Sequence, residues 1–184
     1  MLKKMLCTAA LLSTAIDVSA QTRWDFLYSG FQHEELGIFL PSATIEGSFT
    51  GKDADGDGVL QRGEITSFVI DQLELVDNPD GCQITSCSLL AFSYALTSGK
   101  LNFESSWEYS DDFNYSSQHT VAGLQSTHIG VNGSGELSTT TLRWTDRTSF
   151  WINPPPVPEP SAAALLSVGL LAAGVYRRRW GQRR

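Results

Sequence analysis

The chain has 184 residues, a formal net charge of −7 and an isoelectric point of about 4.8. No basic patch is interleaved with aromatic side chains, so the composition excludes a nucleic-acid-binding protein. Between the two terminal segments, residues 21–156 carry six basic and 18 acidic residues, and their net charge of −12 repels anionic polymers and attracts cations.

The first 20 residues have the three parts of a secretory signal peptide. Lys3 and Lys4 give a positive start, an apolar run extends from residue 5 to residue 16, and a small-residue cleavage site ends at Ala20. We therefore predict that residues 1–20 are removed on export, with a buried N-terminal helix as the alternative.

Residues 21–153 are predicted to form one all-β domain, an antiparallel β-sandwich ectodomain. Short runs rich in Thr, Ser and aromatic residues alternate in polarity and are separated by Gly, Asn and Asp, which is typical of antiparallel strands. Residues 63–75 also fit an amphipathic helix, so the structure of that segment stays open. The expected strand segments are 22–31, 43–51, two runs within 88–110, 120–133 and 135–152.

Residues 53–64 satisfy the twelve-residue pattern of an EF-hand-like calcium loop. Three aspartates occupy positions 1, 3 and 5, because alternate residues of a turning loop point inward and supply the hard oxygens that calcium prefers. Gly58 at position 6 permits a sharp turn with positive φ. The predicted calcium ligands are Asp53, Asp55, Asp57, Val59 through its carbonyl, Gln61 directly or through water, and Glu64 with both oxygens.

The segments around this loop differ from those of a helix–loop–helix site. Residues 43–51 alternate like a strand, so we expect no entering helix, and only one such loop is present. A single extracellular loop should bind weakly, with a dissociation constant of order 10⁻⁴–10⁻³ M. At millimolar calcium this adds about 0.4–1.4 kcal/mol of stability and stiffens the connection between two strands. The alternative is a solvated acidic turn, since Asp-Gly pairs form turns without a metal.

Two cysteines, Cys82 and Cys87, remain once the signal peptide is removed. In an oxidising compartment an even pair at this spacing predicts a local disulfide that closes a small loop. The alternative is a redox or metal-binding thiol pair, which the four-residue spacing and the lack of further cysteines disfavour.

The C-terminal segment, residues 154–184, has the order of a membrane anchor. Residues 154–156 are three prolines that form a stiff spacer, and an apolar helix is expected over residues 162–176. This transmembrane helix is shorter than the ~20 residues that cross a bilayer comfortably. A cytoplasmic stop follows, made of Arg177, Arg178 and Arg179.

The same segment resembles a known sorting signal. Val157, Pro158, Glu159 and Pro160, then an Ala/Leu/Gly-rich helix and terminal arginines, are similar to the PEP-CTERM sorting signal of Gram-negative bacteria. The resemblance covers roughly the last 28 residues. It implies recognition by an exosortase, a transient inner-membrane anchor, and delivery to the cell surface or the extracellular polysaccharide matrix. It implies nothing about activity.

Two functions remain open for the exported domain. The first is a non-enzymatic protein of the cell surface or extracellular matrix, stabilised by one calcium ion. The second is a carbohydrate-binding module associated with exopolysaccharide, in which tryptophans stack on sugar rings. A flat row of exposed tryptophans favours the second function, and buried tryptophans favour the first. The candidate tryptophans are Trp24, Trp107, Trp144 and Trp151.

A hydrolase ranks last among the functions. Two carboxylates would have to converge across a cleft at ~5–9.5 Å, and the adjacent pairs are Glu34–Glu35 and Asp111–Asp112. Neighbouring residues of a strand point to opposite faces, so we expect both pairs to be solvated surface features.

Overall fold

The computed structural model describes residues 21–76 and 86–156. This part of the chain is all β, apart from one single-turn 3₁₀ helix, η1 (Arg62–Glu64). Across the same residues no helix has the length and apolar character needed to cross a membrane. The predicted signal peptide (1–20) and C-terminal helix (162–176) lie outside the described residues. The strands are β1 (Thr22–His33), β2 (Ile38–Gly51), β3 (Val59–Gln61), β4 (Ile65–Ile70), β5 (Leu73–Glu74), β6 (Ser86–Ala95), β7 (Leu101–Ser110), β8 (Tyr115–Val121), β9 (Gln125–Val131), β10 (Leu137–Arg143) and β11 (Ser149–Asn153).

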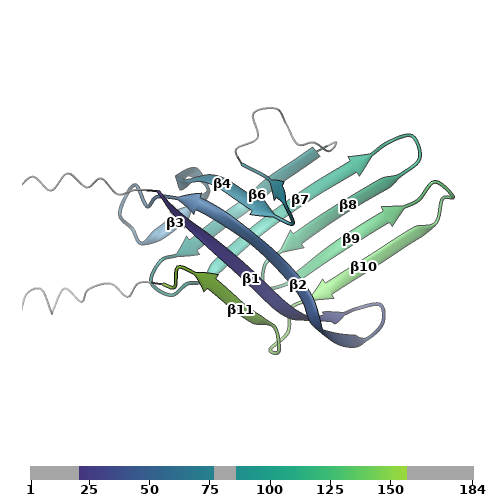
Figure 1. Ribbon diagram of the computed structural model, residues 1–184, viewed down its shortest axis with the longest axis horizontal. Coiled ribbons are helices and arrows are strands. Elements are labelled where there is room, and N and C mark those ends of the chain that lie inside the picture. Colours follow the sequence, from purple (N-terminus) through teal and green to yellow (C-terminus); the bar gives the residue numbers. More distant parts are fainter. Residues whose placement is uncertain (1–20, 77–85, 157–184) are drawn as a thin grey trace, which may run out of the picture.

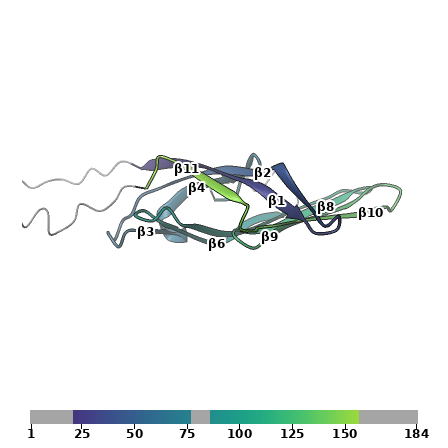
Figure 2. The ribbon, with the colours of Figure 1, turned by 90° about the horizontal axis from the view of Figure 1, so that it is seen from below.

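The strands form one antiparallel sheet that curls into two layers (Figure 1). The hydrogen-bonded order is β3-β6-β7-β8-β9-β10-β1-β2-β4-β5, and β11 pairs with β1. Strands β1, β2, β4 and β11 lie in one layer, and β3, β6, β8, β9 and β10 lie in the other (Figure 2). The predicted all-β antiparallel class is confirmed. The structure differs from the expected sandwich, because its two layers belong to one sheet that is continuous through β1 and β10.

The curl is built into β1, which pairs with a different strand along each part of its length. Residues 25–29 pair with β11, and the last two residues of β1 pair with β10. The register of β1 against β2 shifts between Ser29 and Phe31, where Gly30 has a φ of +81°. Glycine adopts this conformation at little steric cost, and such a bulge bends a strand. One strand therefore belongs to both layers.

The core lies between the layers and consists mainly of aromatic rings. Phe26 of β1 contacts Phe103 of β7 with ring centroids 5.6 Å apart, and Phe49 of β2 contacts Phe92 of β6 at 5.1 Å. These tilted and edge-on contacts are the favourable geometries for aromatic pairs, and burying each ring stabilises the fold by about 1.5–3 kcal/mol. Further large buried side chains of the core are Trp24, Tyr28, Phe31, Phe68 and Tyr94.

The segment left open between helix and strand, residues 63–75, contains strands β4 and β5. The helix-like spacing has a structural origin, because the register of β4 against β2 shifts between the pairs Thr50–Ser67 and Gly51–Ile65. The extra residue in β4 brings Ile65 to the same face as Phe68, three positions apart. The β-bulge therefore gives the apolar side chains of this segment a spacing that also fits an amphipathic helix.

The two predicted runs near the C-terminus each contain two strands. Residues 120–133 include the end of β8, a turn at residues 122–124 and all of β9. Residues 135–152 include β10 and most of β11, separated by residues 144–148. The pair of strands within 88–110, by contrast, is confirmed as β6 and β7.

Candidate functional site

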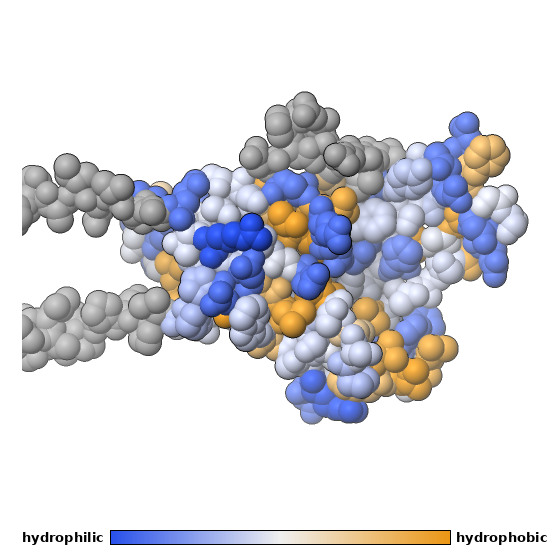
Figure 3. Space-filling model, in the orientation of Figure 1, coloured by the Kyte–Doolittle hydropathy of each residue, from blue (hydrophilic) through white to orange (hydrophobic). Residues whose placement is uncertain are grey.

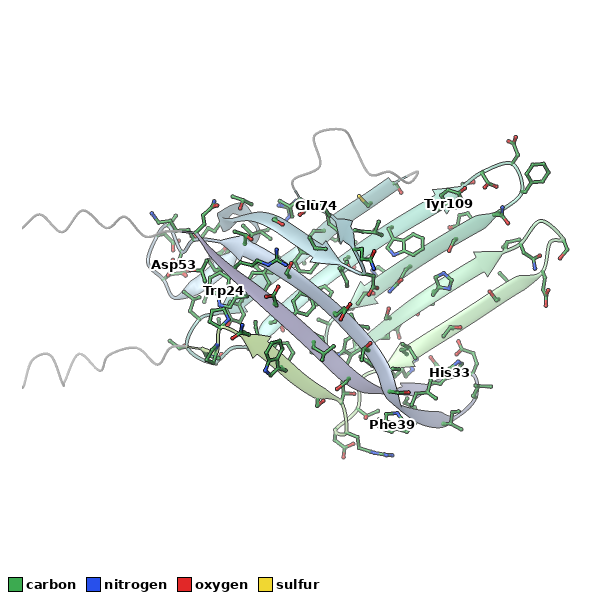
Figure 4. The ribbon with its side chains drawn as sticks, viewed as in Figure 1. Trp24, His33, Phe39, Asp53, Glu74 and Tyr109 are labelled. Atoms are coloured by element: carbon green, nitrogen blue, oxygen red, sulfur yellow. The ribbon has the colours of Figure 1, made fainter. Side chains whose placement is uncertain are left out.

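The acidic loop lies where the chain crosses from one layer to the other and back. It leaves β2, passes through β3, which pairs with β6, and returns to β4, which pairs with β2. Gly58 accepts a hydrogen bond from the backbone N–H of Leu96 at 2.9 Å, and Leu60 of β3 is completely buried in the core. Figure 4 shows Asp53 toward the same end of the molecule as Trp24, opposite the end where Tyr109 lies. The loop is therefore attached to both layers.

Three aspartates converge in this loop as predicted from their spacing. Asp53, Asp55 and Asp57 each place one carboxylate oxygen within 4.8 Å of the others. Asp53 accepts hydrogen bonds from the backbone N–H groups of Gly56 at 2.8 Å and Gly58 at 2.9 Å. Gly58 has a φ of +82°, the positive value expected at position 6. The backbone of the loop thus folds around the carboxylates.

The other three predicted ligands lie in the same loop. The Glu64 carboxylate accepts from the N–H of Ala54 at 2.8 Å and from the N–H of Gln61 at 2.9 Å. These backbone donors hold the pKa of Glu64 below its usual value. The Val59 N–H donates to Asp57 at 2.7 Å, and the Gln61 amide donates to the same carboxylate at 3.4 Å. Carboxylate, amide and carbonyl oxygens are the donor set that fits calcium.

The predicted disulfide falls partly outside the described residues. Cys87 in β6 is disulfide-bonded, while Cys82, its predicted partner, lies in the segment that the structure does not describe. The pairing of Cys82 with Cys87 therefore stays a prediction.

The four candidate tryptophans do not form one row. Trp24 is buried in the core, and Trp144 packs edge-on against Phe31 with ring centroids 4.7 Å apart. Trp151 on β11 is 55% exposed, whereas Trp107 on β7 is half-buried beside His128. Trp24 and Trp144 are thus core residues, and Trp107 and Trp151 lie on different strands that do not pair with each other.

The first carboxylate pair is exposed to solvent, as expected, and it also joins two strands. Glu34 and Glu35 lie in the turn between β1 and β2, so the expected alternation along a strand does not apply to them. Glu34 forms an ion pair with Arg143 of β10 at 2.8 Å. Glu35 accepts from the N–H of Thr141 at 3.0 Å, and this bond lowers the pKa of Glu35. Both carboxylates thus fasten β1 to β10 where the layers meet.

Asp111, in the second pair, organises the turn between β7 and β8. It accepts hydrogen bonds from the hydroxyl of Tyr109 at 2.6 Å and from the N–H groups of Phe113 at 2.8 Å and Asn114 at 2.6 Å. These donors, the hydroxyl foremost, lower the pKa of the Asp111 carboxyl to about 2. Asp111 is therefore a turn-forming residue, as an aspartate that bonds backbone two and three positions on is expected to be.

Sequence reasoning missed a polar face on β7–β10, which we call the open face. Two rows of side chains cross these four strands, each residue directly opposite the next. Alternate residues along β7 mark this face, but only the strand pairing shows which side chains share it. The inner row is Trp107, Gln118, His128 and Thr140, and the outer row is Tyr109, Ser116, Gly130 and Ser138.

Comparison with known proteins gives one match. Residues 156–179 match the PEP-CTERM protein-sorting motif. This confirms the sorting signal inferred from Val157–Pro160 and the residues after it, and it supports an exported protein processed by an exosortase, a membrane protease. No curated protein and no solved structure matches the chain.

Proposed function

We propose that this chain is a non-enzymatic exported protein of the cell surface or extracellular matrix, whose β-fold is stabilised by one calcium ion. The observation that carries the proposal is the match of residues 156–179 to the sorting motif, which supports export and exosortase processing. In this proposal residues 1–20 are removed as a signal peptide and the C-terminal helix anchors the chain transiently in the inner membrane of a Gram-negative bacterium.

Calcium has a specific role in the proposal, which is to hold the crossing between the layers. Asp53, Asp55 and Asp57 repel one another at the separations they have in this loop, and a divalent cation would neutralise that repulsion. The ligand set begins at Asp53, two residues after the end of β2, and extends through β3 to the last residue of η1. Binding would therefore tie the connection to both layers, although the stabilisation expected for a weak site is only about 0.4–1.4 kcal/mol.

Sorting is tested by changing the motif and following where the protein accumulates. Glu159→Ala should leave the protein unprocessed in the inner membrane of a host that carries an exosortase, whereas the wild type should reach the surface or medium in a shorter form. Cell fractionation with immunoblotting measures both changes. Glu136→Ala, which removes an exposed carboxylate from the β-domain, is the matched control and should be sorted like the wild type. Equal processing of the Glu159→Ala and wild-type chains would contradict the proposal.

Calcium binding is tested by calorimetric titration and melting of residues 21–156. One binding event should appear in the wild type. The melting temperature should rise at millimolar calcium, because calcium binds the folded state and not the unfolded chain. The double variant Asp53→Ala/Glu64→Ala should lose both effects. Asp112→Ala/Asp146→Ala removes the same charge from exposed sites and should keep them. Absence of heat and of a melting shift at several millimolar calcium would reduce the loop to a solvated acidic turn.

A further inference from the structure

The open face continues the core-facing side of β7 beyond the part that packs in the core. Along β7, Leu101 and Phe103 are buried in the core, whereas Tyr109 on the same side is 38% exposed. Figure 1 shows β7, β8, β9 and β10 extending past the ends of β2 and β4. In the space-filling view, most of the surface over this end is pale or blue, the colours of intermediate and hydrophilic residues (Figure 3).

The side chains of the open face are linked into one arrangement. The rings of Trp107 and His128 approach with centroids 6.0 Å apart, across the intervening strand β8. The second ring nitrogen of His128 (Nε2) shares a hydrogen bond with the hydroxyl of Ser116 at 2.9 Å, and the Gln118 amide donates to Ser126 at 3.1 Å. The rings and polar groups of this surface are thus held in defined positions.

Asp71 borders the open face from the opposite layer. Gln118 donates a hydrogen bond to the Asp71 carboxylate at 3.4 Å. Asp71 and Gln72 form the two-residue connection between β4 and β5, and their φ values of +48° and +71° are unusual for residues other than glycine. Positive φ at both central residues is the geometry of a tight two-residue hairpin turn, and this turn places Asp71 beside Gln118.

The outer row lines part of a surface hollow. A hollow of about 500 Å³ is lined by all four residues of the outer row, with Asn114, Asn132 and Glu136 at its edge. Gly130 places no side chain between Ser116 and Ser138. The hollow therefore continues the surface of the inner row toward the tips of the strands.

We propose that the open face binds an uncharged saccharide chain. A pyranose ring has an apolar C–H face that packs on an aromatic ring, and Trp107 and Tyr109 offer two such rings, two residues apart on the same side of β7. The rim of a sugar carries hydroxyls, and the open face opposes them with amide, imidazole and hydroxyl groups that both donate and accept.

Charge selects an uncharged saccharide over an anionic one. Neither row of the open face contains a lysine or an arginine, and the carboxylates that border it, Asp71, Asp111 and Glu136, are acidic. With a net charge of −12 over residues 21–156, the domain repels polyanions. This site goes beyond the proposed function and uses no residue of the calcium loop.

The test uses the purified full-length chain in mild detergent, titrated with cellohexaose, maltohexaose and laminarihexaose, and with an alginate hexamer as the anionic comparison. Calorimetry and tryptophan fluorescence should show binding of at least one neutral hexasaccharide, with a dissociation constant of about 1 mM or tighter. Trp107→Ala and Tyr109→Ala should each weaken binding by about tenfold or more, as loss of an anchoring aromatic does. Trp151→Ala removes an exposed tryptophan outside the open face and should leave the affinity unchanged.

Any of three binding results would overturn the saccharide site. They are the absence of binding by all three neutral hexasaccharides, preference for alginate, and unchanged affinity in Trp107→Ala and Tyr109→Ala chains that melt like the wild type. A concentration-dependent dimer that buries Trp107 in sedimentation and fluorescence measurements would show that a second copy covers the face instead. The Asp53→Ala/Glu64→Ala chain should bind the sugar normally, so failure of the calcium site and failure of the saccharide site are distinguishable.

Discussion

Side chains on one side of β7 have different surroundings in the two halves of the strand. In the first half Leu101 and Phe103 are only 5% and 3% exposed and pack against the other layer. In the second half Trp107 and Tyr109 point to the same side and remain partly accessible among polar neighbours. Alternation therefore tells which side of a strand faces inward, while the length of the opposing layer decides whether that side is a core or a surface.

The largest expected effect on the free energy of unfolding comes from removing an aromatic ring from the core between the two layers. Phe49 is fully buried and contacts rings of both layers, so Phe49→Ala should lower the free energy of unfolding by about 3–5 kcal/mol. Trp107→Ala, a larger truncation on the open face, should cost much less because its ring is only half-buried. Denaturant unfolding measures the loss of stability in both variants. Equal losses would contradict the distinction between the core and the open face.

A smaller effect on stability is expected at acidic pH, from Asp111 in the turn that follows β7. The folded pKa of Asp111 is lowered from 3.8 to about 2, so the folded state binds its proton less readily than the unfolded state. The stability that this group contributes is present above about pH 4 and is lost as the pH falls toward 2. Asp111→Asn should therefore flatten the fall in melting temperature over that range.

Tyr109→Phe is the companion variant for this acid dependence. It removes the hydroxyl that contributes most to the lowered pKa of Asp111, so it should flatten the same part of the pH profile less than Asp111→Asn does. Phe49→Ala should shift the whole profile downward without changing its slope, because no titrating group is removed. Identical slopes for Asp111→Asn and the wild type between pH 4 and pH 2 would contradict the role assigned to the Asp111 turn.

Local signals predicted some hairpins of sequence-neighbouring strands, such as β6 and β7, but missed the turn between β8 and β9. The two runs predicted within residues 88–110 are the hairpin of β6 and β7, and the entry of the acidic loop from a strand followed from residues 43–51. The bulge opposite Gly51 could not be foreseen, because a three-residue spacing of apolar side chains fits a helix equally well.

The curl and the open face depend on pairings between distant residues. β1 meets β10 and β11 more than 100 residues later, and no local pattern encodes that pairing. For the same reason, the convergence of the three loop aspartates could be predicted from one short segment, whereas Trp107, Gln118 and His128 could be grouped only after the register of three strands was known.

The pairing of β11 with β1 also determines how the domain would bear a pulling force. Asn153 at the end of β11 lies opposite Asp25 near the start of β1, and five consecutive residue pairs join the two strands. A load applied through the C-terminal segment enters at Asn153 and acts along the strand. All five pairs then resist it together in shear rather than opening one after another. A chain tethered from this end would withstand drag best while keeping the tips of β8–β10 directed away from its attachment point.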